Sequence, residues 1–140
     1  MILRRALARE VLLTSFSVTA VIFCIFIVVR VLGFLRQAVI FNGTVTTAGQ
    51  VALGAPGEPA KEQTENILAT IDKLLAEAGT DKSKAMSATI WLSNMDDFAA
   101  MNEVWDAWVS PGNTPTRACV ESKLAAPQFI VEIAIVAAIE

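Results

Sequence analysis

Three residues near the end of the sequence combine reactive side chains with the spacing of a β-strand. Arg117, Cys119 and Glu121 alternate with small or apolar residues, and alternate residues of a strand point to the same face of a sheet. The guanidinium of Arg117 carries a planar fork of donors that matches a carboxylate with two parallel hydrogen bonds. Arg117 is therefore a candidate for binding and orienting a small acid, and an ion pair with Glu121 or Glu132 is the alternative.

Glu132 is the only charged residue in an apolar segment of ten residues, FIVEIAIVAA, from Phe129 to Ala138. Burying a carboxylate costs free energy unless the group is paired or has a function. Glu132 is therefore either the ion-pair partner of Arg117 or a candidate catalytic carboxylate. Cys119 has no histidine or nearby lysine to lower its pKa, so we interpret it as a small apolar residue with a useful backbone N–H.

The composition excludes several kinds of chemistry. The chain of 140 residues contains no histidine, which removes Ser-His-Asp and Cys-His catalysis and imidazole metal sites. Its two cysteines, Cys24 and Cys119, predict neither a disulfide framework nor a metal cluster. Residues 39–140 contain 6 basic and 13 acidic residues, so we expect no nucleic-acid partner. We also expect no metal and no cofactor.

Short-range patterns predict the elements that position these residues. Asn42-Gly43 lies between two β-rich segments, residues 39–41 and 45–48, and predicts a hairpin with a two-residue turn. Glycines and prolines in residues 54–59 predict a loop. Apolar residues at three- and four-residue spacing then predict a helix that ends at Gly79.

The second half of the chain predicts a strand over residues 85–92, a second helix and two final strands over residues 116–122 and 129–138. The second helix carries an apolar stripe that we interpret as core, formed by Phe98, Met101, Trp105 and Trp108. This order of elements predicts an α+β fold, a five-stranded mixed sheet with two helices on one face. Apolar residues on both faces of the last strand favour burial through oligomerisation.

Residues 1–38 differ from the rest of the chain in charge and hydropathy. Residues 11–29 contain no charge, and a helix that rises about 1.5 Å per residue would there span a bilayer core of about 30 Å. We therefore expect one long apolar helix before the domain, a candidate single-pass membrane anchor, with a signal peptide or a fused unrelated segment as alternatives. Residues 1–38 also resemble the first span of a lipopolysaccharide-export permease. The expected domains are thus 1–38 and 39–140.

Four segments of the second domain resemble the Rid (YjgF) family of reactive-intermediate deaminases. They are TTAGQV from Thr46, ATIWLSNMDDFAAMNEVWDAW from Ala88, PTRACVE from Pro115 and FIVEIAIVAA from Phe129. The resemblance implies a chorismate-mutase-like fold, a homotrimer with pockets in the clefts between subunits, and a cytoplasmic location for this domain.

The resemblance also implies a mechanism. Arg117 matches an arginine that binds the carboxylate of a 2-imino or 2-enamino acid, and the backbone N–H of Cys119 assists it. Glu132 matches a glutamate that activates water for attack on the C=N carbon, which releases ammonia and a 2-oxo acid. Ala48, Gly49 and Asn102 match positions near the family's pocket. The mechanism requires Arg117 to face a crevice between protomers with Glu132 beside it, so we expect both side chains on the same side of the sheet.

Two other functions stay open at this level. The family's pocket is often closed by a tyrosine, and this chain contains none. That difference favours a module that binds small carboxylates without turnover. The apolar N-terminal segment favours a membrane-anchored structural component.

Overall fold

The structure is a computed structural model that describes residues 18–28 and 37–139. The chain divides into two compact units, Met1–Leu35 and Arg36–Glu140. The second unit contains the predicted α+β domain and all the candidate site residues.

The described part of the first unit is a helix over residues 18–28 with exposed side chains. The membrane span predicted over residues 11–29 therefore lies in part outside the described residues. Within the described residues, no helix is long and apolar enough to cross a membrane. The prediction of a long apolar helix before the domain is thus not supported.

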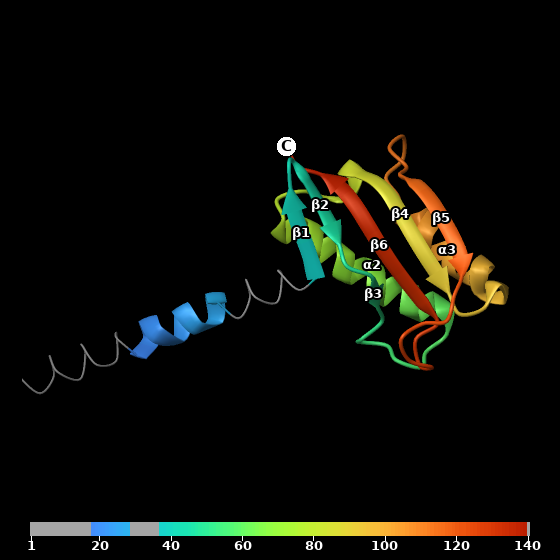
Figure 1. The fold of residues 1–140 in the computed structure, drawn as a ribbon, viewed down its shortest axis with the longest axis horizontal. Helices are drawn as coiled ribbons and strands as arrows, with labels where there is room; N and C mark the ends of the chain where they lie inside the picture. The colour runs from blue at the N-terminus through green and yellow to red at the C-terminus, as the bar shows by residue number, and fades with distance from the viewer. Residues whose placement is uncertain (1–17, 29–36, 140) are drawn as a thin grey trace, which may run out of the picture. The chain divides into compact units, whose positions relative to one another are not determined.

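The second unit contains strands and helices in the predicted order, with one additional strand. Its elements are β1 (Ala38–Phe41), β2 (Thr44–Thr47), β3 (Gln50–Val51), α2 (Ala60–Glu77), η1 (Lys82–Lys84), β4 (Ala85–Leu92), η2 (Met95–Asp97), α3 (Phe98–Trp108), β5 (Thr116–Glu121) and β6 (Val131–Ala138). The strands form one sheet in the order β1-β2-β6-β4-β5, in which only the pairing of β4 with β5 is parallel. The sheet is therefore mixed, as predicted, and β5 lies at its edge (Figure 1).

The sheet has six strands, so the prediction of five was wrong. The additional strand, β3, pairs with β6 beyond the end of β2, after the pairing has shifted by one residue. Such a shift is a β-bulge, which leaves one residue unpaired and bends the strand. The hydroxyl of Thr47 accepts a hydrogen bond from the backbone N–H of Ile135 at 2.9 Å within this bulge. A periodic pattern in the sequence does not reveal where pairing resumes after a bulge.

The predicted turn and helix end are both confirmed. Asn42 and Gly43 have φ values of 49° and 73°, as the two central residues of a tight hairpin turn require. Gly79 has a φ of 81° directly after α2, where a residue with a side chain would be strained.

Both helices pack on one face of the sheet, behind it in the view of Figure 1. The core between the layers contains Ile133 and Ile135 of β6, Ile90 and Leu92 of β4, and apolar residues of both helices. Met101, Trp105 and Trp108 of α3 are buried there, which confirms the interpretation of these three residues of the stripe as core, whereas Phe98 is only partly buried. The helices thus cover every second residue of the central strands.

The other face of the sheet, which we call the open face, is covered by neither helix. Register and burial assign to it Val39, Phe41, Thr46, Thr89, Trp91, Ala118, Val120, Glu132, Ala134 and Val136. Phe41 is 78% exposed and Val120 is 46% exposed on this face. The sequence predicts that another copy of the chain covers this face, and the exposed apolar side chains agree with that prediction.

Candidate functional site

Arg117 lies on the edge strand β5 and faces helix α3. Its register partner on β4 is Ala88, a buried residue of the helix-covered face, so the two side chains point to the same side of the sheet. The guanidinium carbon lies 5.7 Å from the ring centre of Phe98 and 5.5 Å from that of Trp105, both on α3. These aromatic rings attract the cation and hold it against the helix.

The guanidinium of Arg117 is hydrogen-bonded to a neutral group. Its Nη1 donates to Oδ1 of Asn102 at 2.6 Å, and Nδ2 of Asn102 donates to Oδ2 of Asp106 at 2.7 Å. Glu121, the alternative partner, instead accepts a hydrogen bond from the backbone N–H of Met95 at 3.0 Å. Among the described residues, no ion pair joins Arg117 to Glu121 or Glu132. The positive charge of Arg117 is therefore available to an anion.

Cys119 presents its backbone N–H at the free edge of the sheet. Ser122, directly after β5, donates its own backbone N–H to the carbonyl of Leu92 in β4 at 2.8 Å. Because N–H groups alternate in direction along a strand, those of Arg117 and Cys119 point away from β4. Within the part of the chain that the structure describes, an outward N–H without a partner thus lies on the same strand as the guanidinium, two residues further along. Together the two groups can donate to the oxygens of a small carboxylate.

The thiol of Cys119 is half-buried, and this burial raises its pKa above the ordinary value, while the positive charge of Arg117 partly offsets the increase. A thiol with a raised pKa is a poor nucleophile at neutral pH. This agrees with the interpretation of Cys119 as a provider of a backbone donor.

Glu132 lies on the open face, on the other side of the sheet from Arg117. It pairs across β6 and β4 with Trp91, and across β6 and β3 with Val51. Its carboxylate lies directly over Gly49, since a Cβ placed on Gly49 would come 1.8 Å from Oε1 of Glu132. Only a glycine at position 49 leaves space for this position of the carboxylate.

The bulge between β2 and β3 brings Gly49 beneath the glutamate. Ala48 donates its backbone N–H to the carbonyl of Gln37 at 2.6 Å, and its own carbonyl accepts from Nε2 of Gln50 at 2.9 Å. These contacts hold Ala48 and Gly49 in an exposed bend beside Glu132. The carboxylate thus lies close to the backbone of a segment that is remote in sequence.

The structure divides the six predicted residues into two groups, which we call the arginine half-site and the glutamate half-site. The arginine half-site comprises Asn102, Arg117 and Cys119, and the glutamate half-site comprises Ala48, Gly49 and Glu132. Because the half-sites lie on opposite faces of one sheet, a single copy of the chain does not bring Arg117 and Glu132 together. The expectation that Glu132 lies on the same side of the sheet as Arg117 was wrong, and so was the alternative of an ion pair between them within one copy. A site that contains both residues needs a second copy.

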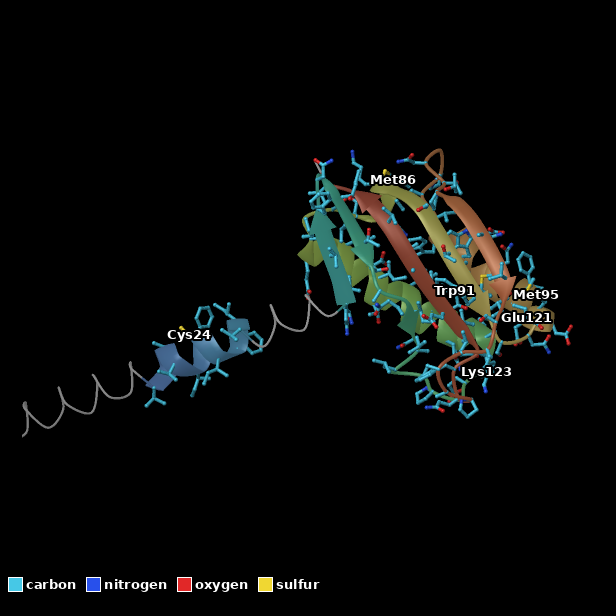
Figure 2. All side chains as sticks on the ribbon, in the orientation of Figure 1. Cys24, Met86, Trp91, Met95, Glu121 and Lys123 are labelled. Atoms are coloured by element: carbon cyan, nitrogen blue, oxygen red, sulfur yellow. The ribbon has the colours of Figure 1, made fainter. Side chains whose placement is uncertain are left out.

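Three contributions to the half-sites were not predicted from the sequence. Trp91 lies opposite Glu132 on the open face and is labelled in Figure 2, and Phe98 and Trp105 lie against the guanidinium. Asp106 is bonded to Asn102 one helical turn away. The i, i+4 spacing of Asn102 and Asp106 on a predicted helix was the signal that could have identified this pair.

A hollow of about 790 Å³ lies beside the C-terminal end of β5, close to Glu121 and Lys123 in Figure 2. It is lined by Ser93, by residues 121–127 and by Phe129. None of the six predicted residues belongs to it. Among the described residues, no cluster of three or more cysteine, aspartate or glutamate side chains could hold a metal ion.

The α+β domain carries an arginine and an outward-pointing backbone N–H at the edge of its sheet, and comparison with known proteins identifies its family. The family model described as endoribonuclease L-PSP matches residues 29–139. A RutC family protein of Haemophilus ducreyi is 47% identical over 103 residues, which are 74% of this chain and 87% of that protein. The RutC family protein YoaB of Escherichia coli is 51% identical over 80 residues, or 57% and 70% of the two chains.

A solved structure agrees with these sequence relatives. The crystal structure of NMB1025 of Neisseria meningitidis, a member of the YjgF protein family, superimposes with a TM-score of 0.71 at 50% identity, covering 74% of this chain and 86% of that one. The chain belongs to the Rid family, which includes the YjgF, RutC and L-PSP proteins. None of the matches described is a permease, so the permease resemblance of residues 1–38 is not supported.

Proposed function

We propose that this protein hydrolyses reactive 2-imino and 2-enamino acids to 2-oxo acids and ammonia. Arg117 and the backbone N–H of Cys119 bind the substrate carboxylate, and Glu132 of a neighbouring copy activates water. The proposal rests mainly on the surroundings of Arg117. Its guanidinium is held against α3 by Asn102 and two aromatic rings, and a backbone N–H that points outward lies beside it. Among the described residues it has no carboxylate partner.

The chemistry requires only positioning and one proton-transfer group. Glu132 accepts a proton from water as the water oxygen attacks the imine carbon, and then gives this proton to the nitrogen, which becomes an amino group. Glu132 next takes the proton of the new hydroxyl group and passes it to the same nitrogen. The tetrahedral intermediate then loses ammonia, which leaves the 2-oxo acid. A 2-enamino acid first takes a proton on its terminal carbon to form the imine. An imine is already electrophilic, so a correctly positioned substrate and one general base suffice for its hydrolysis.

A homotrimer built through the open face would join the half-sites. The open face carries exposed apolar side chains, and a second copy that covers them gains hydrophobic free energy. Arg117 lies on the edge strand, so it is close to the boundary at which one sheet would meet the open face of the next. In a cyclic assembly every copy then supplies one arginine half-site and one glutamate half-site to different pockets.

Hydrolysis of a small imine fits this chain better than cleavage of RNA, which the name of the family model describes. The second domain carries 6 basic and 13 acidic residues, and such a surface repels a polyphosphate chain. The two alternatives from the sequence, a module without turnover and a membrane-anchored structural component, gain no support from the relatives found. We therefore propose the small reactive acids as substrates.

The first experiment measures the reaction directly. 2-Aminoacrylate is generated in the cuvette by a dehydratase, and its disappearance is followed with the wild-type protein, with Arg117→Ala and with Glu132→Gln. We expect both variants to lose at least about a hundredfold in rate, because one removes the carboxylate anchor and the other the general base. Equal rates for the wild type and Arg117→Ala would reject the proposal.

A second experiment tests whether the site is shared between copies. Arg117→Ala and Glu132→Gln are unfolded together, refolded as a mixture, and assayed. In a trimer with shared sites, each mixed assembly regains one intact pocket, so an equal mixture recovers about a quarter of the wild-type activity. Separately refolded variants mixed afterwards provide the control. Recovery of no activity, from assemblies shown by mass to be mixed, would contradict a site shared between copies.

A further inference from the structure

Asp106 lies next to the arginine half-site and contacts it through Asn102. It lies on α3 one turn after Asn102, it is exposed, and its Oδ2 accepts a hydrogen bond from Nδ2 of Asn102 at 2.7 Å. The other end of the same amide, Oδ1, accepts from Nη1 of Arg117 at 2.6 Å. Asp106, Asn102 and Arg117 thus form a chain of two short hydrogen bonds.

The chemistry of the two end groups fixes the orientation of the amide between them. An ionised carboxylate only accepts hydrogen bonds, and a guanidinium only donates them. The NH₂ group of Asn102 must therefore face Asp106, and its carbonyl oxygen must face Arg117. Without Asp106 the amide is free to rotate by half a turn and present its NH₂ group to the guanidinium, which would remove the contact that holds Arg117.

We propose that Asp106 is a positioning residue, which acts through Asn102 to hold the guanidinium of Arg117 in the orientation that binds a carboxylate. The inference rests on the proposed function, because the carboxylate is that of the 2-imino acid or its 2-oxo acid product. Asp106 does not touch the ligand in this scheme. Its effect is on binding, equally in the ground state and the transition state, so KM rises and kcat stays within about twofold.

The direction in which ligand affinity changes when Asp106 is removed separates a positioning role from a purely electrostatic one. A negative charge near an anion site repels the ligand, so removal of Asp106 would tighten binding if charge were its only contribution. If Asp106 positions Arg117, its removal weakens binding. For Asp106→Ala we expect roughly three- to tenfold weaker binding of 2-oxobutyrate and an equal rise in KM, which is the effect of losing one ordinary intramolecular hydrogen bond. Asp106→Asn keeps an acceptor but also brings a donor, so its effect should be smaller.

Folding does not obscure this test. Alanine has a higher helix propensity than aspartate at an exposed position, so Asp106→Ala should melt no earlier than the wild type. Glu103→Gln is the control, since it also removes one carboxylate from α3. Glu103 pairs with Lys61 and not with the side-chain amide of Asn102. We expect this control to bind 2-oxobutyrate as the wild type does.

A double-mutant cycle shows whether Asp106 acts through Asn102. In an Asn102→Ala background, Asp106→Ala should cause no further loss of affinity, because the intermediate amide is already absent. An equal loss in both backgrounds, or unchanged or tighter binding by Asp106→Ala alone, would overturn the inference.

The exchange rate of the Arg117 Nη–H groups, measured by NMR without ligand, separates the two proposals, because Nη1 is the donor to Asn102. Faster exchange in Asp106→Ala supports the positioning role. If the wild type also hydrolyses no imine, the positioning role stands and only the proposed function fails. Unchanged exchange rejects positioning.

Discussion

Gly49→Ala offers a test of the glutamate half-site that removes no polar group. The φ angle of Gly49 lies outside the left-handed region, so an alanine can adopt the same backbone. The added Cβ, however, would lie 1.8 Å from Oε1 of Glu132, 2.8 Å from Cδ and 3.1 Å from Cγ. The carboxylate of Glu132 must therefore move, since the methyl group is fixed to the backbone.

The size of the movement sets the expected loss of activity. Contacts of a Cβ below 3.0 Å are essentially never seen, so Oε1 must shift by more than 1 Å. A misplacement of about 1 Å in a catalytic group can cost about a hundredfold in rate. We expect kcat for 2-aminoacrylate to fall by about this factor. Binding of 2-oxobutyrate should change by less than about twofold, because Gly49→Ala alters none of the groups proposed to bind the carboxylate.

The assay combines turnover with binding and thermal melting. The displaced group is the end of a flexible side chain, so the melting temperature should fall by only a few degrees, about the effect of 1 kcal/mol in a domain of this size. Adding Gly49→Ala to Glu132→Gln should cause almost no further loss, because the displaced group no longer acts as a base. A folded Gly49→Ala protein with wild-type kcat would refute the assignment of Glu132 as the base.

Three further outcomes are expected. Arg117→Lys keeps the charge but loses the planar fork, so KM for the imine should rise about tenfold or more in the same assay. In a Cys24→Ser background, the midpoint of iodoacetamide alkylation of Cys119 should lie at higher pH than for a free thiol, because burial raises its pKa. Arg117→Gln should move this midpoint higher still, because the charge of Arg117 lowers that pKa. Thr47→Val leaves the buried backbone N–H of Ile135 without an acceptor, which should cost about 1–3 kcal/mol in urea unfolding.

Local patterns were sufficient to predict most elements of the second domain. The Asn42-Gly43 turn, the helix end at Gly79 and the strand over Ala85–Leu92 each depend on a few neighbouring residues, and each lies where the pattern predicted it. The shared face of Arg117, Cys119 and Glu121 also follows from alternation within one strand, and the register with β4 agrees with it.

Features that depend on pairing between distant segments could not be predicted in this way. The strand β3 exists because the pairing with β6 resumes after the bulge at Thr47, and no local pattern specifies that shift. The same limit applies to Arg117 and Glu132. Each lies in a strand whose alternation is clear from the sequence, but only the register of β4 with both β5 and β6 decides that their side chains point to opposite faces.

The separation of the two charged groups by the sheet has a physical consequence for the proposed site. Had they shared a face of one copy, the guanidinium and the carboxylate would be able to form an ion pair, and substrate would have to compete with it. On opposite faces neither neutralises the other within one copy. In the proposed trimer they meet at a pocket that also admits the substrate carboxylate, which satisfies the guanidinium and leaves Glu132 free to accept a proton from water. The assembly that covers the apolar open face would therefore also be the one that completes the site.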